Sequence, residues 1–456
     1  MIFNKALEII TIIEKRGYTA LIVGGAVRDF LMQRPVPDID LATDMPMDQL
    51  SRLFLSSDIG RSKDFGILGI EYKGEHFEIS EMTRKGVHSK RNASGDEQKE
   101  MLFSADARRR DFTINAMAMD RAGMILDPLE GQVDIENKII RTVREPDRVF
   151  NDDPLRLFRA IRFASALGFE IEPGTLEGIE RLSSSISTVA PERIGRELIL
   201  LASLPGKDLA TGLRVMERTG LLEQILPEIS ILNEFDHDPE HHPEGGVYRH
   251  TLAALRANKK ADPGINLSIL FHDCGKAVTY DLKEARPSYC SHDKAGEAII
   301  RKAGARLRFS RKLIGIMSFV ALNHMKGLRI GEMRPSKTFR LMTHPCWPVL
   351  EAAVRCDLLA RSADRARRFD REAAETARKL RHWMDKEKSK PRPVITGRQV
   401  MEYTGLAQGP DVGRIMKLTT TWAIDNQVTD QARIREYALN ASRLKKTEMT
   451  VNPMVI

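Results

Sequence analysis

Two aspartates separated by one residue, Asp38 and Asp40, are the first side chains in this sequence whose types and spacing could do chemistry. A β-strand through this stretch would place both carboxylates on one face, with Ile39 and Leu41 pointing into the core. Carboxylates about 7 Å apart along a strand supply the hard oxygen ligands that Mg²⁺ prefers. The pair therefore predicts a site for two Mg²⁺ ions, although a solvated edge strand would also explain Asp-Ile-Asp taken alone.

A glycine turn upstream of this pair favours phosphate binding. The apolar residues 21–23 run into Gly24 and Gly25 and then into the start of a helix that contains Arg28. Glycines allow backbone N–H groups to approach phosphate oxygens without interference from a Cβ atom. Phosphoryl transfer requires metal ligands together with donors for the phosphates, so we expect these three residues to bind a nucleotide triphosphate.

A third polar segment, RRDFTINA, contains Arg109, Arg110 and Asp111 at the start of an apolar helical stretch. Two guanidinium groups beside a carboxylate are the mixture that the phosphates and ribose of a nucleotide require. We therefore expect this segment to contribute to the same nucleotide site.

In this order, GGAVRD, DID and RRRDFTINAMAMD resemble the class II tRNA nucleotidyltransferases and bacterial poly(A) polymerases, within the polymerase-β-like nucleotidyltransferases. The resemblance implies a small mixed α/β head in which Asp38 and Asp40 hold the metal. It also implies that Arg109, Arg110 and Asp111 recognise ribose and phosphate. The implied partners are the 3′ end of tRNA, CTP and ATP.

The family usually has a further acidic residue on a neighbouring strand, for which Glu78 in HFEIS is the candidate. The spacing from Glu78 to Arg84 is one residue longer than the family pattern, so Glu81 stays a rival and a surface glutamate an alternative. Residues 127–131 resemble the hinge segment of the family, while an ordinary turn with a helix cap explains them as well.

A helix after Pro154 carries Asp153 and Arg156 three residues apart, so both side chains can reach one flat ligand. Cytosine and adenine each offer an amino donor beside a ring-nitrogen acceptor, which suits a carboxylate beside a guanidinium, whereas uracil and guanine offer the reverse. The pair therefore predicts selection of C and A, although helix capping also explains the acidic residues here. Arg159 is a further predicted nucleotide-binding residue.

The same segment resembles the Glu-Asp-x-x-Arg motif of the family, from which Asp152 departs because it replaces the glutamate. Glu192, Arg193 and Glu197 resemble the last motif of the family's neck, which implies that they brace the base-selecting helix. An Arg and a Glu four residues apart are common on any helix, so we interpret their role as structural.

Histidines and aspartates recur in the second half of the chain in the order H, HD, H, H, D. This series resembles the HD phosphohydrolases, in which such residues surround one or two divalent metals. The resemblance implies a transition metal (Mn, Ni, Co or Fe) and phosphatase or phosphodiesterase activity on 2′-phosphates and 2′,3′-cyclic ends. His241 and His242 lie in a Pro/Gly-rich loop and are expected to be exposed. The predicted ligands are His250, His272, Asp273, His292, His324 and Asp357.

The elements that must position these residues change type along the chain. Short apolar strands are expected at 20–23, 39–42, 68–72 and 77–80, and helical periodicity dominates afterwards. The predicted fold is α+β: a mixed α/β head (1–145), a helical neck (146–232), an HD body (233–385) and a helical tail (386–456). A mobile loop is expected at 86–100, a break at 235–246 and a charged linker at 386–393.

The composition supports this interpretation. The 456 residues include 71 Lys and Arg against 63 Asp and Glu, a net charge of +8 that suits a polyanionic partner. No apolar run is long enough for a membrane span, and residues 1–15 form an apolar-spaced helix without the features of a signal peptide. The 4 cysteines are scattered without a CxxC pair, so no disulfide framework is expected. We expect a cytoplasmic protein. The sequence does not indicate an oligomeric state.

The C-terminal segment that contains ITGRQVMEYTGLAQGPDVGRIM resembles the part that follows the HD domain in the family. Its last basic residues would suit an RNA backbone, although a solvated helix face explains them equally. These residues are Arg433, Arg435, Arg443, Lys445 and Lys446.

The predicted function is template-independent addition or repair of the 3′-terminal CCA of tRNA, with CTP and ATP as substrates and pyrophosphate as product. A poly(A) polymerase, or a partial enzyme that adds only CC or only A, would have the same head chemistry. An alternative of another class is a phosphohydrolase whose head chiefly holds RNA.

Overall fold

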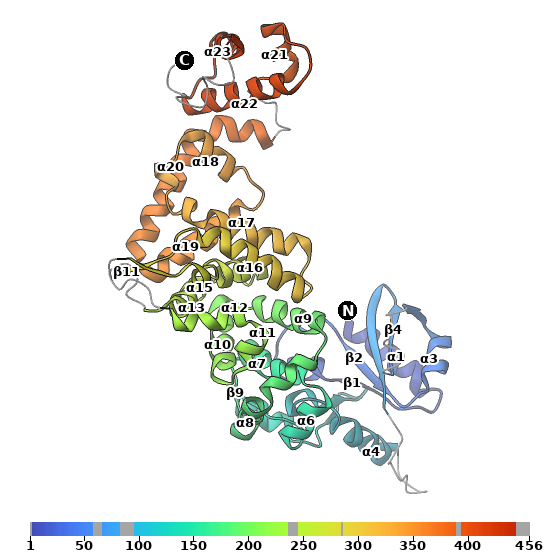
Figure 1. Cartoon of the computed structure of the whole chain (residues 1–456). Helices are drawn as coiled ribbons and strands as arrows, with labels where there is room; N and C mark the ends of the chain where they lie inside the picture. The colour runs from blue at the N-terminus through green and yellow to red at the C-terminus, as the bar shows by residue number, and fades with distance from the viewer. Residues whose placement is uncertain are drawn as a thin grey trace. The chain divides into compact units, whose positions relative to one another are not determined.

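The computed structural model describes residues 2–57, 66–82, 95–235, 245–283, 286–388 and 394–443. The chain forms two compact units (Figure 1): Met1–Ser230 with Arg306–Arg308, and Ile231–Ala305 with Phe309–Ile456. The mixed α/β beginning followed by helices confirms the predicted α+β fold. The finer division into four parts at residues 145, 232 and 385 stays a prediction.

Within the described residues, one seven-stranded sheet organises the head, in the order β3-β4-β5-β2-β1-β6-β7. β2 and β5 are parallel, and the other neighbours in this sheet are antiparallel. The four predicted strands correspond to β1, β2, β4 and β5. The strands are β1 (Ala20–Val23), β2 (Asp40–Thr43), β3 (Leu55–Ser57), β4 (Ile67–Tyr72), β5 (Glu75–Glu81), β6 (Ala118–Met119) and β7 (Ile125–Leu126).

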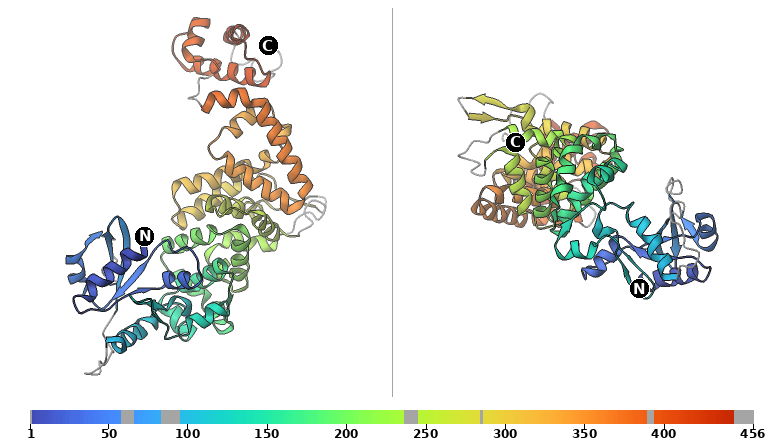
Figure 2. Two further views of the ribbon diagram at one scale, coloured as in Figure 1. Left: turned by 180° about the vertical axis from the view of Figure 1, so that it is seen from behind. Right: turned by 90° about the horizontal axis from the view of Figure 1, so that it is seen from below.

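Helices cover this sheet, as Figure 2 shows from two further sides. Ile9, Ile10 and Ile13 of α1 are buried in one core with Leu41 of β2 and Ile79 of β5. Burial of these aliphatic side chains fixes which faces of β2 and β5 remain for polar residues. The helices of the head are α1 (Ile2–Glu14), α2 (Gly25–Leu31), α3 (Met47–Leu53), α4 (Gly95–Ala107) and α5 (Gly131–Glu136).

The predicted loop at 86–100 is wrong over its last six residues, because α4 begins at Gly95. Glu97 to Glu100 are good helix formers and precede Leu102 and Phe103, which are buried. Helix propensity and burial therefore outweigh the polarity of the segment. Residues 86–94 of the predicted loop lie outside the described residues.

The rest of the first unit is helical apart from a short parallel pair, β8 (Ile139–Ile140) with β9 (Glu170–Ile171). Proline occupies the first turn of α6, α8 and α9, where its missing N–H costs nothing. The helices are α6 (Pro146–Asp152), α7 (Leu155–Leu167), α8 (Pro173–Leu182), α9 (Pro191–Ala202), α10 (Gly206–Arg218), α11 (Leu221–Ile225) and α12 (Pro227–Ser230).

The second unit is a helical assembly with one hairpin, β10 (Asp281–Lys283) and β11 (Arg286–Ser288). α13, α14, α17 and α19 pack against one another, and α20 packs on α18 and α19. The helices are α13 (Val247–Ala257), α14 (Pro263–Phe271), α15 (Lys276–Thr279), α16 (His292–Arg306), α17 (Arg311–Gly327), α18 (Pro335–Met342), α19 (Trp347–Arg361), α20 (Ala363–Lys388), α21 (Gly397–Thr404), α22 (Pro410–Asp425) and α23 (Gln431–Arg443).

The predicted linker at 386–393 is wrong over its first three residues, because α20 continues to Lys388. Lys386, Glu387 and Lys388 are good helix formers, so a charged composition alone does not end a helix. Residues 389–393 lie outside the described residues, as do residues 236–244 of the predicted break, which include His241 and His242.

No helix in the described part of the chain combines the length and the apolarity that a membrane crossing requires. The cytoplasmic location stays a prediction.

Candidate functional site

The register of two parallel strands brings the head carboxylates together. Asp40 at the start of β2 lies opposite Glu78 of β5, and Asp38 precedes β2 by two residues. All three line one cavity of about 960 Å³. Glu81 lies opposite Thr43 and is not among the residues that line this cavity. Of the two rivals for the third carboxylate, Glu78 is therefore the one beside Asp40.

The carboxyl group of Asp40 ionises less readily than an ordinary aspartate. Its side chain reaches the cavity, yet burial by the surrounding protein and the negative charges of Glu78 and Asp38 raise its pKa to about 6, against the opposing effect of Arg110. Three carboxylates that repel one another need a cation to balance them. The donor set therefore fits a divalent metal held by oxygen ligands.

The glycine turn brings the backbone close to an arginine. Gly24 has a φ of +73°, and a Cβ atom there would lie 3.2 Å from Nη1 of Arg110. Its N–H donates to the carbonyl of Met117 at 3.1 Å, which ties the turn to β6. Gly25 begins α2 and lines the cavity next to Arg28. The turn thus lies at the cavity wall, and its binding of phosphate stays a prediction.

Arg28 is held within the wall rather than extended into the cavity. Its side chain is 8% exposed, and it donates two hydrogen bonds of 3.0 Å to Asp29 and one of 2.7 Å to Oδ1 of Asn115. Burial lowers its pKa from the usual arginine value, and Asp29 opposes that effect. Arg28 therefore contributes positive charge behind the glycine turn.

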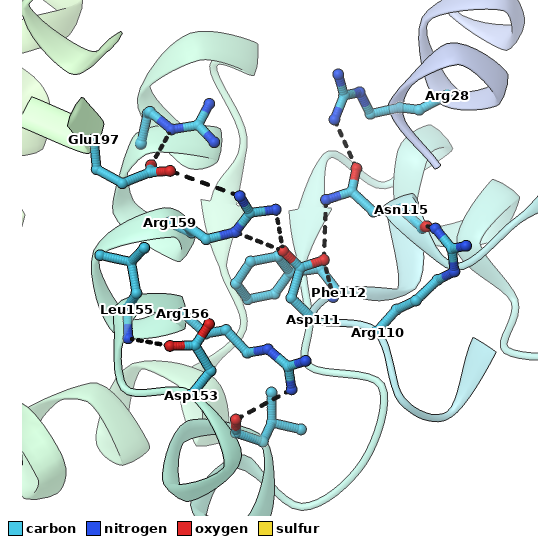
Figure 3. Close-up of polar contacts among 12 residues, drawn as sticks. Arg28, Arg110, Asp111, Phe112, Asn115, Asp153, Leu155, Arg156, Arg159 and Glu197 are labelled. Carbon is cyan, nitrogen blue, oxygen red and sulfur yellow. Dashed lines mark hydrogen bonds and ion pairs between the residues drawn. The ribbon is translucent and has the colours of Figure 1, made fainter. Parts of the chain in front are cut away.

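Asp111 is the centre of a buried network (Figure 3). Its Oδ2 accepts two hydrogen bonds from Arg159, at 2.9 and 2.7 Å, and its Oδ1 accepts from the N–H of Phe112 and from Nδ2 of Asn115. Although burial disfavours the charged form, Arg159 and these donors hold the pKa of Asp111 below its usual value. Asp111 thus links the head to α7.

Arg109 and Arg110 differ in how firmly they are held. Nε of Arg110 donates to Asp106 at 2.9 Å, so its guanidinium is fixed at the cavity. Arg109 is exposed, and its carbonyl oxygen accepts a hydrogen bond of 2.8 Å from Arg156. The backbone of Arg109 therefore orients the guanidinium of Arg156 on α7.

Asp153 and Arg156 lie at the start of α7 and both line the cavity (Figure 3). Oδ1 of Asp153 accepts from the N–H of Leu155, the first residue of α7, at 3.2 Å, although the N-cap residue of this helix is Pro154. Arg193 of α9 donates to both oxygens of Asp153, at 3.2 and 2.8 Å. Besides its bond to Arg109, Arg156 donates to the carbonyl of Val149 at 3.3 Å.

The helix α9 braces α7, as the family resemblance implies, but through two separate contacts. Arg193 pairs with Asp153, while the buried Glu197 accepts from Arg162 and lies 3.6 Å from Arg159. Asp152 instead pairs with Arg144 and is not among the cavity residues.

Sequence reasoning missed several residues of the cavity wall. Arg162 and Arg196 follow Arg159 and Arg193 by three residues on their helices, and this spacing could have identified them. Asn115 lies in the RRDFTINA segment, where its amide bridges Arg28 and Asp111. With these residues, the lining of the cavity is rich in arginine.

A second cluster lies in the second unit, where the whole HD series meets. His250 is on α13, His272 follows α14, His324 is on α17 and Asp357 is on α19. Among the described residues, two groups could each hold a metal ion, because within each group the ligand atoms lie within 4.8 Å of one another. One group is His250, His272 and Asp273, and the other is Asp273, His292 and His324. Asp273 belongs to both groups.

Backbone carbonyls set the orientation of three imidazoles. Nδ1 of His272, His292 and His324 lies 2.7, 2.8 and 2.7 Å from the carbonyl of the residue three positions earlier. A carbonyl only accepts, so each Nδ1 carries a hydrogen, and Nε2 is the ring nitrogen that faces the other residues of the cluster. Nε2 of His292 and Nε2 of His324 are 3.1 Å apart. Two Nε2 atoms this close to each other could bind the same metal ion.

The charges of this cluster also suit a metal. Burial lowers the pKa of His324 to about 4, against the opposing effect of Asp273, so its imidazole is neutral at pH 7. Despite burial, His272 and Lys276 hold the pKa of Asp273 well below its usual range. Nε2 of His272 and Oδ2 of Asp357 are buried without a hydrogen-bond partner. Buried polar atoms of this kind indicate a site for a ligand.

Sequence reasoning missed Lys276, whose Nζ lies 2.6 Å from Oδ2 of Asp273 and whose residue is 6% exposed. Its position one turn after Asp273 could have identified it. A buried ammonium group beside the central carboxylate adds positive charge to the cluster.

Two family models match the first unit. The model for the poly A polymerase head domain matches residues 20–141, and the model for the probable RNA and SrmB-binding site of polymerase A matches residues 168–232.

Curated relatives match a longer stretch. The multifunctional CCA protein of Halorhodospira halophila is 32% identical over 328 residues, which cover 70% of this chain and 76% of that protein. The CCA-adding enzyme of Bacillus subtilis is 38% identical over 225 residues, 49% of this chain and 56% of that enzyme.

Solved structures share the fold over nearly the whole chain. The Bacillus stearothermophilus CCA-adding enzyme in complex with CTP has a TM-score of 0.65 and 23% identity, with 97% of this chain and 98% of that chain covered. The Thermotoga maritima CCA-adding enzyme complexed with tRNA has a TM-score of 0.58 and 17% identity, with 96% and 95% covered.

Proposed function

Because this chain belongs to the family of CCA-adding enzymes and multifunctional CCA proteins, we propose that it adds or repairs the 3′-terminal CCA of tRNA with CTP and ATP. The reaction needs no nucleic-acid template and releases pyrophosphate. A poly(A) polymerase or a partial enzyme would share the head, but the named relatives favour full CCA addition.

One observation carries the proposal: three carboxylates and an arginine-rich wall share one cavity. Asp38, Asp40 and Glu78 would hold Mg²⁺, because their oxygens are the ligands it prefers and their mutual repulsion calls for a cation. A bound Mg²⁺ would lower the pKa of the RNA 3′-hydroxyl and neutralise charge on the reacting phosphate.

The remaining wall would bind the nucleotide. Gly24 and Gly25 allow close approach of the triphosphate to the backbone, and Arg28 and Arg110 provide positive charge behind it. Arg109 would complete the predicted ribose and phosphate contacts, whereas Asp111, whose oxygens already accept four hydrogen bonds, would act by positioning its neighbours. The network of Asp111 with Arg159 would keep this surface aligned with α7.

Asp153 and Arg156 would select the base. Arg193 and the N–H of Leu155 use three acceptor positions of the Asp153 carboxylate, which leaves about one lone pair for an amino group. The backbone bonds of Arg156 fix the guanidinium that would donate to the ring nitrogen. Cytosine and adenine match this pair, whereas uracil and guanine would leave unpaired polar groups.

Incubation of the protein with tRNA that ends at the discriminator base, followed by sequencing of the product, tests the proposal. With CTP and ATP together the expected product ends in CCA. Asp38→Ala and Asp40→Ala should abolish addition while tRNA affinity stays nearly unchanged. Use of ATP alone with a poly(A) product would show a poly(A) polymerase instead.

We also propose a second activity, metal-dependent hydrolysis of 2′-phosphates or 2′,3′-cyclic phosphates by the HD cluster. The orphaned buried Nε2 of His272 and the convergence of two ligand groups on Asp273 support it. Imidazoles with carboxylates suit a transition metal such as Mn, Ni, Co or Fe. Hydrolysis of 2′,3′-cyclic AMP, measured with each metal after chelation, tests this activity, and no turnover with any of them would contradict it.

A further inference from the structure

A second cavity, of about 720 Å³, lies in the second unit between the C-terminal end of α17 and α18. Figure 1 shows these two helices and the turn that joins them. The apolar surface of this cavity comes from Phe319, Met325, Met333 and Leu341. Met325 is 44% exposed, so its side chain is accessible at the surface of this cavity.

Four cations border this apolar surface in two pairs. Lys326 lies in the last turn of α17 and Arg329 two residues beyond the end of that helix, while Lys337 and Arg340 lie on α18. The three-residue spacing places Lys337 and Arg340 on one side of α18, and all four cations border the same cavity. We call this surface the α17–α18 groove.

These cations are not neutralised by the protein. Within the described residues, no Asp or Glu lines the groove, and no carboxylate lies within 4.0 Å of Lys326, Lys337 or Arg340. Arg329 reaches Glu332 at 3.9 Å, but both side chains are largely exposed, so water screens this pair. Like charges that gather without counterions cost free energy, which an anionic partner would recover.

We propose that the α17–α18 groove, which shares no residue with the carboxylate cavity of the first unit, binds an unstacked segment of the tRNA substrate. The inference rests on the proposed CCA addition, which makes tRNA the partner. Backbone phosphates would lie on the two cationic edges, and a base would cover the apolar surface around Met325 and Met333, since the ring of Phe319 already stacks on His344. Four cations on two segments exceed what one phosphate needs, which favours a polynucleotide over a small anion.

Charge reversal tests the groove against a matched control. The double variants Lys326→Glu with Arg329→Glu, and Lys337→Glu with Arg340→Glu, each change the net charge by −4. Arg311→Glu with Lys312→Glu makes the same change at the exposed N-terminal end of α17. Each groove variant should weaken tRNA affinity by about 10-fold or more and flatten its salt dependence, whereas the control should change it about 2-fold.

Kinetics separate this inference from the proposed function. The KM for tRNA should rise in the groove variants, while kcat at saturating tRNA and the KM for CTP stay within about 2-fold of the unmodified protein. Equal losses of tRNA affinity in the groove variants and the control variant would overturn the proposal that the groove binds tRNA. An unmodified protein that neither binds nor extends tRNA would instead overturn the proposed function.

A photo-reactive benzoylphenylalanine in place of Met325 gives a direct readout. It should cross-link to tRNA at one or a few nucleotides, and competing unlabelled tRNA should suppress the cross-link. The same group at Lys312 is the control. Cross-links to a second copy of the chain alone, or equal RNA labelling at both positions, would overturn the proposal.

Discussion

At the scale of the residue, Asp40 should titrate near pH 6 in the metal-free protein, because its pKa is raised to about 6. The carboxyl is neutral below that pH, so it can hold a cation only above it. Glu78→Gln removes one neighbouring negative charge and should therefore lower the pKa of Asp40. Carboxyl ¹³C NMR of aspartate-labelled protein measures this, with Asp40→Asn to assign the signal. An unchanged pKa in Glu78→Gln would contradict the assigned cause.

Arg193 should act as a positioning residue for base selection, because it holds both oxygens of Asp153. Arg193→Gln should raise UTP and GTP incorporation relative to CTP by about 10-fold, since the carboxylate can then rotate. Arg193→Lys should rescue this only in part, because an ammonium group lacks the planar fork. Selectivity among the four nucleotides, measured as kcat/KM ratios, is the readout.

Arg196→Gln is the matched control, because Arg196 lines the same cavity from the next turn of α9. Within the described residues it donates no hydrogen bond to Asp153. Relaxed selectivity in both variants would mean that the positive charge of the wall, rather than the geometry of Asp153, is responsible. The sequence could not predict the Arg193 contact, since it joins residues 40 positions apart through helix packing.

At the scale of the element, the parallel register of β2 and β5 places Glu78 opposite Asp40 and Glu81 opposite Thr43, so only Glu78 lies beside the metal-binding carboxylate proposed here. Glu78→Gln should reduce nucleotide addition by about 10²-fold, because it removes a carboxylate beside Asp40. Glu81→Gln should leave addition nearly normal. Single-turnover addition of one C to tRNA measures both variants, and a larger loss in Glu81→Gln would refute the assignment.

Elements were predictable where one physical signal dominated. Ala20–Val23 is an uninterrupted aliphatic segment, and the alternation around Asp38 and Asp40 has the period of a strand. Alternation also buries Ile39 and Leu41, as predicted. The start of α4 and the end of α20 were missed because polar composition was taken as a sign of a loop, whereas Glu and Lys propagate helices well.

At the scale of the whole molecule, the two clusters belong to separate compact units. His272→Ala with Asp273→Ala should therefore abolish metal-stimulated hydrolysis of 2′,3′-cyclic nucleotides. CCA addition should stay within about 3-fold of normal, because the two clusters share no residue and belong to separate units. Both activities are measured on one preparation, with circular dichroism to confirm folding. Collapse of CCA addition in the folded variant would show that the units act together.

The hydrogen bonds from Nδ1 to backbone carbonyls, which orient the imidazoles of the HD cluster, also affect how many protons are released when a metal binds. His324 is already neutral at pH 7, because its pKa is lowered to about 4, and its Nδ1 hydrogen is retained by the carbonyl of Ala321. Recruiting this imidazole to a metal therefore releases no proton to the solvent. In calorimetric titrations, His324 should then contribute nothing to the difference in apparent enthalpy between buffers of high and low ionisation enthalpy. The protein would take up metal in this cluster without acidifying its surroundings through His324.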